Sequence, residues 1–186
     1  MLKLKTERLI LRQATSNDAA QICDYVNRNR EFMAEWEPSR DEAYYTENFW
    51  RDKIKSMHKA FVEDRQIDLF MFESEDETRV IGKISFSGII RGMFHACYLG
   101  FALDQDKVGK WLMYEGLTAA IIYMFKEQNL HRIMANHLLH NRRSETLLHR
   151  LGFAREGVAK NYLLIAGEWQ NHILTSITNR RWKEER

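Results

Sequence analysis

The stretch Tyr98–Phe125, which reads YLGFALDQDKVGKWLMYEGLTAAIIYMF, has the composition of an anion-binding corner. A short apolar run ends at Leu103, a polar segment follows, and Gly109 leads into a run of apolar and small residues. This pattern predicts a strand, a loop and a helix, with glycine where the helix begins. The first N–H groups of a helix lack intrahelical acceptors and lie at the positive end of its dipole. A phosphate or pyrophosphate would therefore fit against this corner.

On its own this stretch has a simpler interpretation, because one glycine between a strand and a helix is commonly only a turn. Two later segments add chemistry, namely HNRRSETLLHRLGF at His140–Phe153 and KNYLLIAGEW at Lys160–Trp169. In the first of these, Asn141 and Ser144 are of residue types that could bind a ligand or move a proton. The same two residues also fit the role of capping a short helix.

Together with HACYLGFAL at His95–Leu103 and HRIMAN at His131–Asn136, these segments resemble the GNAT acetyltransferases, specifically the RimJ and RimL type. The resemblance extends from about Leu4 to the C-terminus and keeps the segments in family order. It implies an α/β protein with the GNAT fold, a mixed, mostly antiparallel twisted sheet flanked by helices, in a single domain over residues 1–186. It also implies transfer of acetyl from acetyl-CoA, and members of the RimJ type acetylate the N-terminal alanine of a small-subunit ribosomal protein.

The resemblance further implies which residues hold acetyl-CoA. The pantetheine arm is expected along the strand that ends in Phe101, Ala102 and Leu103, where it pairs with the strand edge like an extra strand. Asn141 is expected as another contact. The pyrophosphate is expected on the backbone N–H groups around the start of the following helix, which are those of Val108, Gly109, Lys110, Trp111, Leu112 and Met113.

The loop departs from the family pattern, which is Gln or Arg, two residues, Gly, one residue, then Gly or Ala. Here Asp106 stands at the first of these positions and Trp111 at the last, so only Gly109 is retained. Asp106 places a negative charge near a pyrophosphate, which we expect Lys107 and Lys110 to offset in part. Because binding uses main-chain donors, a Trp111 side chain that projects away from the ligand would still permit it.

Acetyl transfer to an amine requires that the amine lose a proton and that the departing thiolate gain one. The resemblance assigns the second role to Ser144, since the tyrosine of many GNAT enzymes is replaced here by Leu148. The base is not found in this way, because the glutamate of RimL-type enzymes corresponds to Leu163. Glu37 and His95 have suitable chemistry for the base, and a solvated or structural role is the alternative for each.

Capping residues, apolar periodicity and turn residues predict the remaining elements. A first helix is expected to begin at the capping cluster Thr15–Asp18, and a short second helix to end at about Glu35. Further helices are expected over Ala43–Val62, from Gly109 onward and over Arg143–Arg150. Strands are expected at Lys3–Arg12, Ile67–Glu73, Arg79–Ser87, Tyr98–Leu103, Arg132–Leu138, Tyr162–Ile165 and Glu168–Ile177, with a turn at Ala166-Gly167.

Composition narrows the class of protein. With 186 residues, 45% of them hydrophobic and 12% aromatic, the chain predicts one folded domain. A net charge of +2 from 28 basic and 26 acidic residues gives no argument for a nucleic-acid partner. No apolar run approaches the roughly 20 residues of a membrane span, and the charged N-terminal segment is unlike a signal peptide, so a cytoplasmic protein is expected. The histidines match no zinc spacing, and no metal is expected.

The expected partner is the N-terminus of a ribosomal protein, with the ribosome or its precursor as a further candidate. The sequence does not indicate an oligomeric state. An acidic run could receive a basic peptide, or it could form a solvated face of mixed charge with neighbouring arginines. The run comprises Glu31, Glu35, Glu37, Asp41 and Glu42.

Two other functions stay open from the sequence. A RimL-like or small-molecule amine acetyltransferase would have a closed, small pocket between the Glu31–Tyr45 region and the final hairpin, whereas a peptide acceptor predicts an open groove there. A catalytically weak, ribosome-associated binding protein would keep the fold without the chemistry, and Asp106, Trp111 and Leu163 favour this interpretation.

Overall fold

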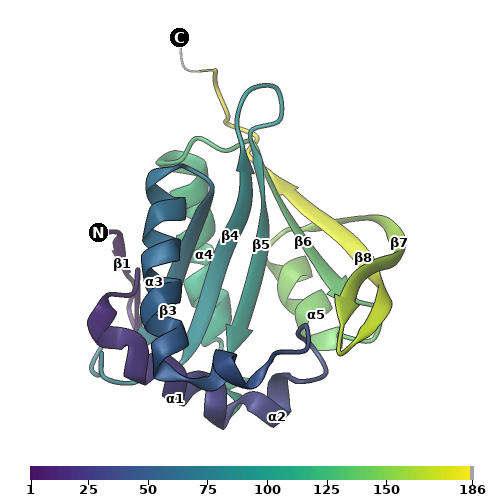
Figure 1. Cartoon of the computed structure of the whole chain (residues 1–186). Coiled ribbons are helices and arrows are strands. Elements are labelled where there is room, and N and C mark those ends of the chain that lie inside the picture. The colour runs from purple at the N-terminus through teal and green to yellow at the C-terminus, as the bar shows by residue number, and fades with distance from the viewer. Residues whose placement is uncertain (185–186) are drawn as a thin grey trace.

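A single eight-stranded sheet organises the computed structural model, which describes residues 1–184 (Figure 1). Its strand order is β1-β2-β3-β4-β5-β6-β8-β7, and every neighbouring pair is antiparallel except β5 and β6. The predicted mixed, mostly antiparallel sheet is therefore confirmed. The strands are β1 (Lys3–Lys5), β2 (Leu9–Arg12), β3 (Gln66–Glu73), β4 (Gly82–Ile90), β5 (Ala96–Leu103), β6 (Arg132–Leu138), β7 (Ala154–Ile165) and β8 (Glu168–Thr178).

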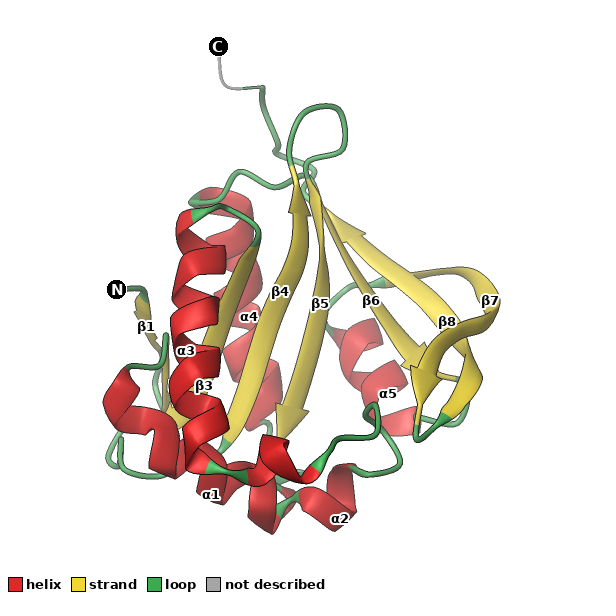
Figure 2. Cartoon of the chain, viewed as in Figure 1, coloured by secondary structure: helices red, strands yellow, loops and turns green. Residues whose placement is uncertain are grey.

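Helices cover both faces of the sheet, with α1 and α3 on one face and α4 and α5 on the other (Figure 2). Alternation along β3 shows how one strand serves both layers, because Phe70 and Phe72 pack with α1 and α3 whereas Leu69 and Met71 pack with α4. The helices are α1 (Ala19–Arg28), α2 (Arg30–Met33), α3 (Glu47–Val62), α4 (Leu112–Lys126) and α5 (Arg142–Arg150), and short 3-10 turns span Ser16–Asp18, Glu42–Tyr45 and Gln105–Lys107. Across residues 1–184, no helix has the length and apolar character needed to cross a membrane.

Several predicted boundaries are wrong for local reasons. The expected strand Lys3–Arg12 is a hairpin, because the N–H of Thr6 donates to the Leu9 carbonyl (2.9 Å) and folds β1 back on β2. The helix expected from Ala43 begins at Glu47, where the Thr46 hydroxyl accepts from the Phe49 N–H at 3.4 Å and caps the first turn.

Two more boundaries are shifted near the site. β4 begins at Gly82 rather than Arg79, and the helix expected from Gly109 begins at Leu112. β7 begins at Ala154, well before the predicted Tyr162, because its first half is largely exposed and two register shifts hide the two-residue period.

The parallel pair at the centre of the sheet opens toward one end. β5 pairs with β6 only where Ala96–Tyr98 meets Arg132–Met134, although both strands continue further. Beyond this point β5 remains paired with β4, and β6 remains paired with β8. The edge of β5 from Leu99 to Leu103 therefore has no strand partner, and Figure 1 shows the two halves of the sheet diverging there.

Candidate active site

The corner after β5 is anchored by a buried carboxylate, Asp104. Its Oδ2 accepts from Arg28 Nε at 2.8 Å and from Arg79 Nη2 at 3.2 Å, and its Oδ1 accepts from the Asp106 N–H at 3.1 Å. Burial alone would raise the pKa of Asp104, but these hydrogen bonds and the charge of Arg28 hold the pKa below its usual value. The turn that leads into α4 is thus fixed to α1 and to the segment just before β4.

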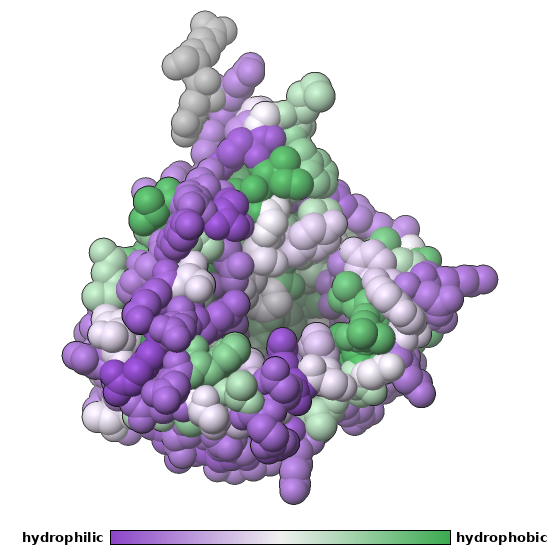
Figure 3. Space-filling view, viewed as in Figure 1, coloured by the Kyte–Doolittle hydropathy of each residue, from purple (hydrophilic) through white to green (hydrophobic). Residues whose placement is uncertain are grey.

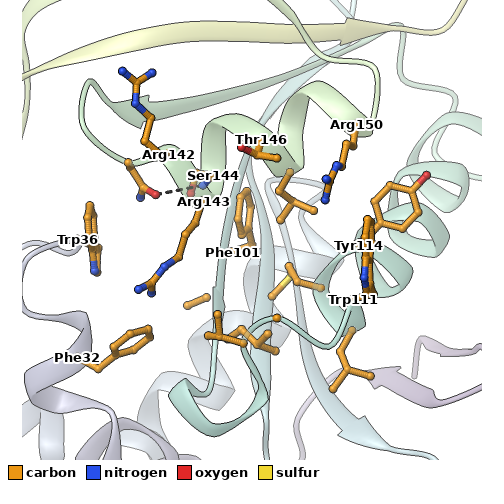
Figure 4. Close-up of a pocket in the computed structure, with 18 of the residues that line it drawn as sticks. Phe32, Trp36, Phe101, Trp111, Tyr114, Arg142, Arg143, Ser144, Thr146 and Arg150 are labelled. Carbon is orange, nitrogen blue, oxygen red and sulfur yellow. Dashed lines mark hydrogen bonds between the residues drawn. The ribbon is translucent and has the colours of Figure 1, made fainter.

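Trp111 caps α4 in an unusual backbone conformation. Its φ of 64° lies in the left-handed region, where a bulky side chain is rare, and Gly109 also has a positive φ of 82°. The indole is 55% exposed and lies under the guanidinium of Arg150, whose Cζ is 4.6 Å from the ring centroid. The Tyr114 ring meets the indole edge-on at 5.8 Å, so the Trp111 side chain is turned toward α5 (Figure 4).

A cavity of about 690 Å³ lies between the end of β5, the start of α4 and α5 (Figure 4); we call it the donor cavity. Ser144 lines this cavity, whereas Lys110 does not. The other residues predicted to contact acetyl-CoA all line it, and they are Phe101, Ala102, Leu103, Val108, Gly109, Trp111, Leu112, Met113 and Asn141.

Asn141 and Ser144 open α5 as a capping pair. The Ser144 N–H donates to Asn141 Oδ1 at 3.1 Å, which is the structural role that the sequence allowed for them (Figure 4). Both side chains also lie at the cavity surface, so capping and ligand contact are compatible in the same residues. The cap fixes Ser144 by its main chain and leaves its hydroxyl group free to face a ligand.

Three arginines of α5 line the donor cavity and were not predicted from the sequence, and the same is true of the aromatic residues Phe32, Trp36 and Tyr114. Arg143 points across the cavity toward Phe32, with its guanidinium 5.4 Å from that ring, while Arg150 reaches Trp111 (Figure 4). Arg142 is instead paired with Glu145 at 2.6 Å. Arg143 and Arg150 are two helical turns apart, and this spacing was the available signal for a shared helix face.

A second cavity, of about 310 Å³, lies on the sheet face toward the loop that follows α2; we call it the acceptor cavity. Figure 3 shows the hollow on this face of the molecule. Glu37, Lys83 and His172 are among its lining residues. The two cavities share Met33, Trp36, Phe101, Ala102, Asn141 and Ser144, so they meet at the open edge of β5.

The acceptor cavity is bounded by a bridge between distant segments. The Ala166 N–H, at the β7–β8 turn, donates to the Glu37 carbonyl at 3.1 Å. His140 Nε2 lies 3.2 Å from Glu35 Oε1, and its ring lies 5.4 Å from that of Trp36. The loop after α2 is therefore held against both the final hairpin and His140, which lies two residues before α5.

The charged residues of this region mostly satisfy one another. Arg30 pairs with Glu42, and Arg40 Nη2 lies 3.8 Å from Glu37 Oε2, which favours the face of mixed charge over an acidic docking site. We expected Lys107 to offset part of the negative charge of Asp106. This prediction is wrong, because Lys107 pairs with Glu73 at 2.6 Å. Arg79, at 3.4 Å, is the partner of Asp106 instead.

His95 is not brought to this site. It precedes β5 at the end opposite Leu103, roughly 25 Å away along the strand, and it lines neither cavity. Its ring lies 5.1 Å from that of Trp182, and its Nδ1 is buried with no partner among the described residues. Leu163, at the position of the RimL-type glutamate, is 43% exposed on β7 and lines neither cavity.

Sequence comparison places this arrangement in a family. Residues 8–154 match the acetyltransferase (GNAT) domain, so the chain belongs to the GNAT acetyltransferases, and the predicted resemblance is confirmed. The protein is an acetyltransferase whose acetyl donor is acetyl-CoA. The donor cavity suits that ligand, because it joins an unpaired strand edge, free helix-start N–H groups and the guanidinium groups of Arg143 and Arg150.

Individual relatives narrow the comparison. The [ribosomal protein uS5]-alanine N-acetyltransferase of Escherichia coli (strain K12) is 44% identical over 181 residues, covering 97% of this chain and 93% of that protein. The crystal structure of ribosomal-protein-S5-alanine acetyltransferase from Vibrio fischeri is 38% identical with a TM-score of 0.94, covering 99% of this chain and all of that one. RimJ of Mycobacterium smegmatis in complex with CoA-disulfide has a TM-score of 0.88 at 22% identity, covering 95% of this chain and 84% of that one, and it supports the fold alone.

Proposed function

We propose that this protein acetylates the N-terminal alanine of ribosomal protein uS5, and that it does so in the cytoplasm. The observation that carries the proposal is the 44% identity to the Escherichia coli uS5-alanine N-acetyltransferase over nearly the whole of both chains. The acceptor cavity, of only about 310 Å³, does not carry the proposal, because a peptide acceptor predicts an open groove at this place.

The proposed roles of the side chains follow from the two cavities. Acetyl-CoA lies in the donor cavity, along the β5 edge at Phe101–Leu103 and against the corner around Gly109, with Asn141 as a further contact. The amine enters through the acceptor cavity. Ser144 faces both cavities and returns a proton to the departing sulfur. Apolar walls from Trp36 and Phe101 exclude water from the place where the two substrates meet.

A small-molecule amine is the second candidate acceptor, and one observation favours it. The acceptor cavity has a volume of only about 310 Å³, and the Ala166 N–H holds Glu37, one of its lining residues, against the final hairpin. A polyamine or an amino metabolite would fit that space without needing a groove for further residues.

Direct transfer tests the proposal. Unacetylated Escherichia coli uS5 that starts with alanine is incubated with acetyl-CoA and this protein, and the product is mapped by mass spectrometry of its N-terminal peptide. We expect one acetyl group on the α-amine and none on lysine side chains. A matched uS5 that starts with serine tests the preference for alanine, and a panel of small amines runs in parallel.

Two results would contradict the proposal. Acetylation of small amines without acetylation of uS5 would favour the second candidate. Binding of acetyl-CoA without transfer to any amine would favour a binding protein that retains the fold.

A further inference from the structure

His172 is a buried histidine on the wall of the acceptor cavity. It lies on β8, opposite Leu138 of β6 and Ala159 of β7, and only 3% of it is exposed. On β6, Ile133 and Ala135 face the core under α4, so Leu138 and its partner His172 face the opposite side of the sheet. That side carries the acceptor cavity, which His172 lines together with Glu37 and Ser144.

One hydrogen bond sets the chemical state of the His172 ring. Its Nδ1 lies 3.0 Å from the carbonyl oxygen of Gln170. A carbonyl can only accept, so Nδ1 carries the hydrogen and Nε2 keeps its lone pair. Within residues 1–184, Nε2 has no hydrogen-bond partner, and it is not among the fully buried polar atoms that lack one. The unshared electron pair is therefore available to a molecule in the cavity.

The surroundings keep this imidazole neutral. Burial lowers the pKa of His172, and the neighbouring His137 lowers it further, although the bond to Gln170 acts in the opposite direction. A lowered pKa leaves the ring unprotonated at neutral pH, which is the form that can accept a proton. The other charged or titratable groups around the cavity are Glu37, Arg40 and Lys83, and the Tyr162 ring lies 5.7 Å from that of His172.

We propose that Nε2 of His172 is the general base that removes a proton from the ammonium group of the acceptor. The proposal rests on the proposed function, in that the acceptor is an α-amine. The proton moves from the ammonium to Nε2, giving a neutral amine and an imidazolium that later releases the proton to water. The amine nitrogen then forms its bond to the acetyl carbon as the carbon–sulfur bond breaks. Ser144 gives its hydroxyl proton to the departing sulfur, and the acetylated nitrogen then gives up its second proton, which restores the Ser144 hydroxyl group.

Glu37 is the other candidate base in this cavity, and its setting is less suitable. Its carboxylate is about one-third exposed and lies 3.8 Å from Arg40, so it is solvated and partly neutralised. A neutral imidazole, by contrast, has a basicity suited to an amine near neutral pH.

His172→Asn is the variant that tests the proposal. The Asn side-chain amide can still donate to the Gln170 carbonyl, while nothing replaces the Nε2 lone pair. We expect kcat/KM at pH 7 to fall about 100-fold, with the deficit shrinking above pH ~8, where the α-amine loses its proton unaided. Acetyl-CoA affinity by calorimetry and the melting temperature should match those of the unmodified protein.

His137→Asn is the matched control, since His137 also lines the cavity and its Nδ1 also lies 3.0 Å from a carbonyl oxygen, that of Leu138. It should lose at most a few-fold in rate. Because the substitution removes one cause of the lowered pKa of His172, the acidic limb of its pH profile should move slightly toward higher pH, without the large deficit near pH 7 expected of His172→Asn. The proposal is overturned if His172→Asn keeps the original rate and pH profile, or if its loss is the same at every pH.

Nitrogen NMR of the histidine rings decides the proposal independently of the acceptor. At pH 7 the His172 ring should show a protonated Nδ1 and an unprotonated Nε2, and it should titrate below the ordinary value of about 6.5. A ring protonated at Nε2 would overturn the proposal. Failure to acetylate uS5 would instead reject the proposed acceptor, and the pH series would then use whichever amine of the panel is acetylated.

Discussion

The donor and acceptor cavities are adjacent but are built in different ways. Apart from residues just after α1, the donor cavity is formed by one stretch of chain from β5 through α4 to α5. The acceptor cavity draws on β4, β6, β8 and the loop after α2, which meet only in the folded sheet. We therefore expect acetyl-CoA to bind to structure that is local in the sequence, and the acceptor amine to meet surfaces that can change independently of the donor cavity.

The largest effect is expected from removing the charge that anchors the donor side. Asp104→Asn leaves Arg28 and Arg79 without their buried partner, so unfolding free energy should fall by about 3–5 kcal/mol and the melting temperature by roughly 10 °C. Thermal and urea unfolding measure both. Asp106→Asn is the control, because that exposed carboxylate lies 3.4 Å from Arg79 and should change stability by less than about 1 kcal/mol.

The same pair of variants gives a signed pH dependence. The folded-state pKa of Asp104 is depressed, so its contribution to stability is present above the unfolded value of about 3.9 and is lost as pH falls through the folded value. The unfolding free energies of the unmodified protein and of Asp104→Asn should therefore converge below about pH 4. A constant difference from pH 7 to pH 3 would mean that the carboxylate acts by shape and not by charge.

The next largest effect, on kcat, is expected from the hydroxyl group of Ser144, which lies where the two cavities meet. Ser144→Ala removes the proposed proton donor and keeps the main-chain N–H that Asn141 caps, so kcat should fall about 100-fold without loss of stability. Acetyl-CoA affinity, measured by calorimetry, should not change. Thr146→Ala removes a hydroxyl that lines only the donor cavity, and an equal loss of kcat in that variant would contradict the role of Ser144.

The sequence predicted the donor cavity better than the acceptor cavity, because the donor cavity is built mostly from one contiguous stretch of chain. The strand, loop and helix around Gly109 are contiguous, so local patterns locate them, and Asn141 and Ser144 follow from family order. The start of α4 was misplaced because Trp111 adopts a left-handed conformation that no local rule anticipates. The arginines of α5 were missed because their direction depends on how the helix packs.

On the acceptor side, prediction depended on long-range pairing. His95 was considered because it begins the central strand, but the site lies at the other end of that strand. His172 was overlooked because its neighbours in the sequence are unremarkable, and its position follows from its register with Leu138. Glu37, which was also considered from the sequence, does line the acceptor cavity, because the Ala166 N–H holds its loop in position.

A smaller effect, on acetyl-CoA affinity, should distinguish Arg150 from Arg142, two arginines of α5. Arg150 contacts the Trp111 ring and has no carboxylate partner among the described residues, so Arg150→Gln should weaken acetyl-CoA binding about tenfold. The loss should shrink as salt is added, because the contact is between charges. Arg142→Gln should change affinity by less than about twofold, since Arg142 is 78% exposed and paired with Glu145. Equal losses in both variants would mean that only the net charge of the helix matters.

The smallest effect is expected at the residue that departs furthest from the family pattern. Trp111→Gly removes a left-handed strain of about 1–2 kcal/mol but loses an exposed cation–π contact of about 0.5–1 kcal/mol and makes the unfolded chain more flexible. These contributions nearly cancel, so stability should change little. Because the expected phosphate donors are main-chain N–H groups and the indole is turned toward Arg150, calorimetry should give acetyl-CoA affinities within about threefold of each other. Binding by the glycine variant alone would show that the indole blocks the corner, and the donor cavity would then be unable to serve catalysis in this chain.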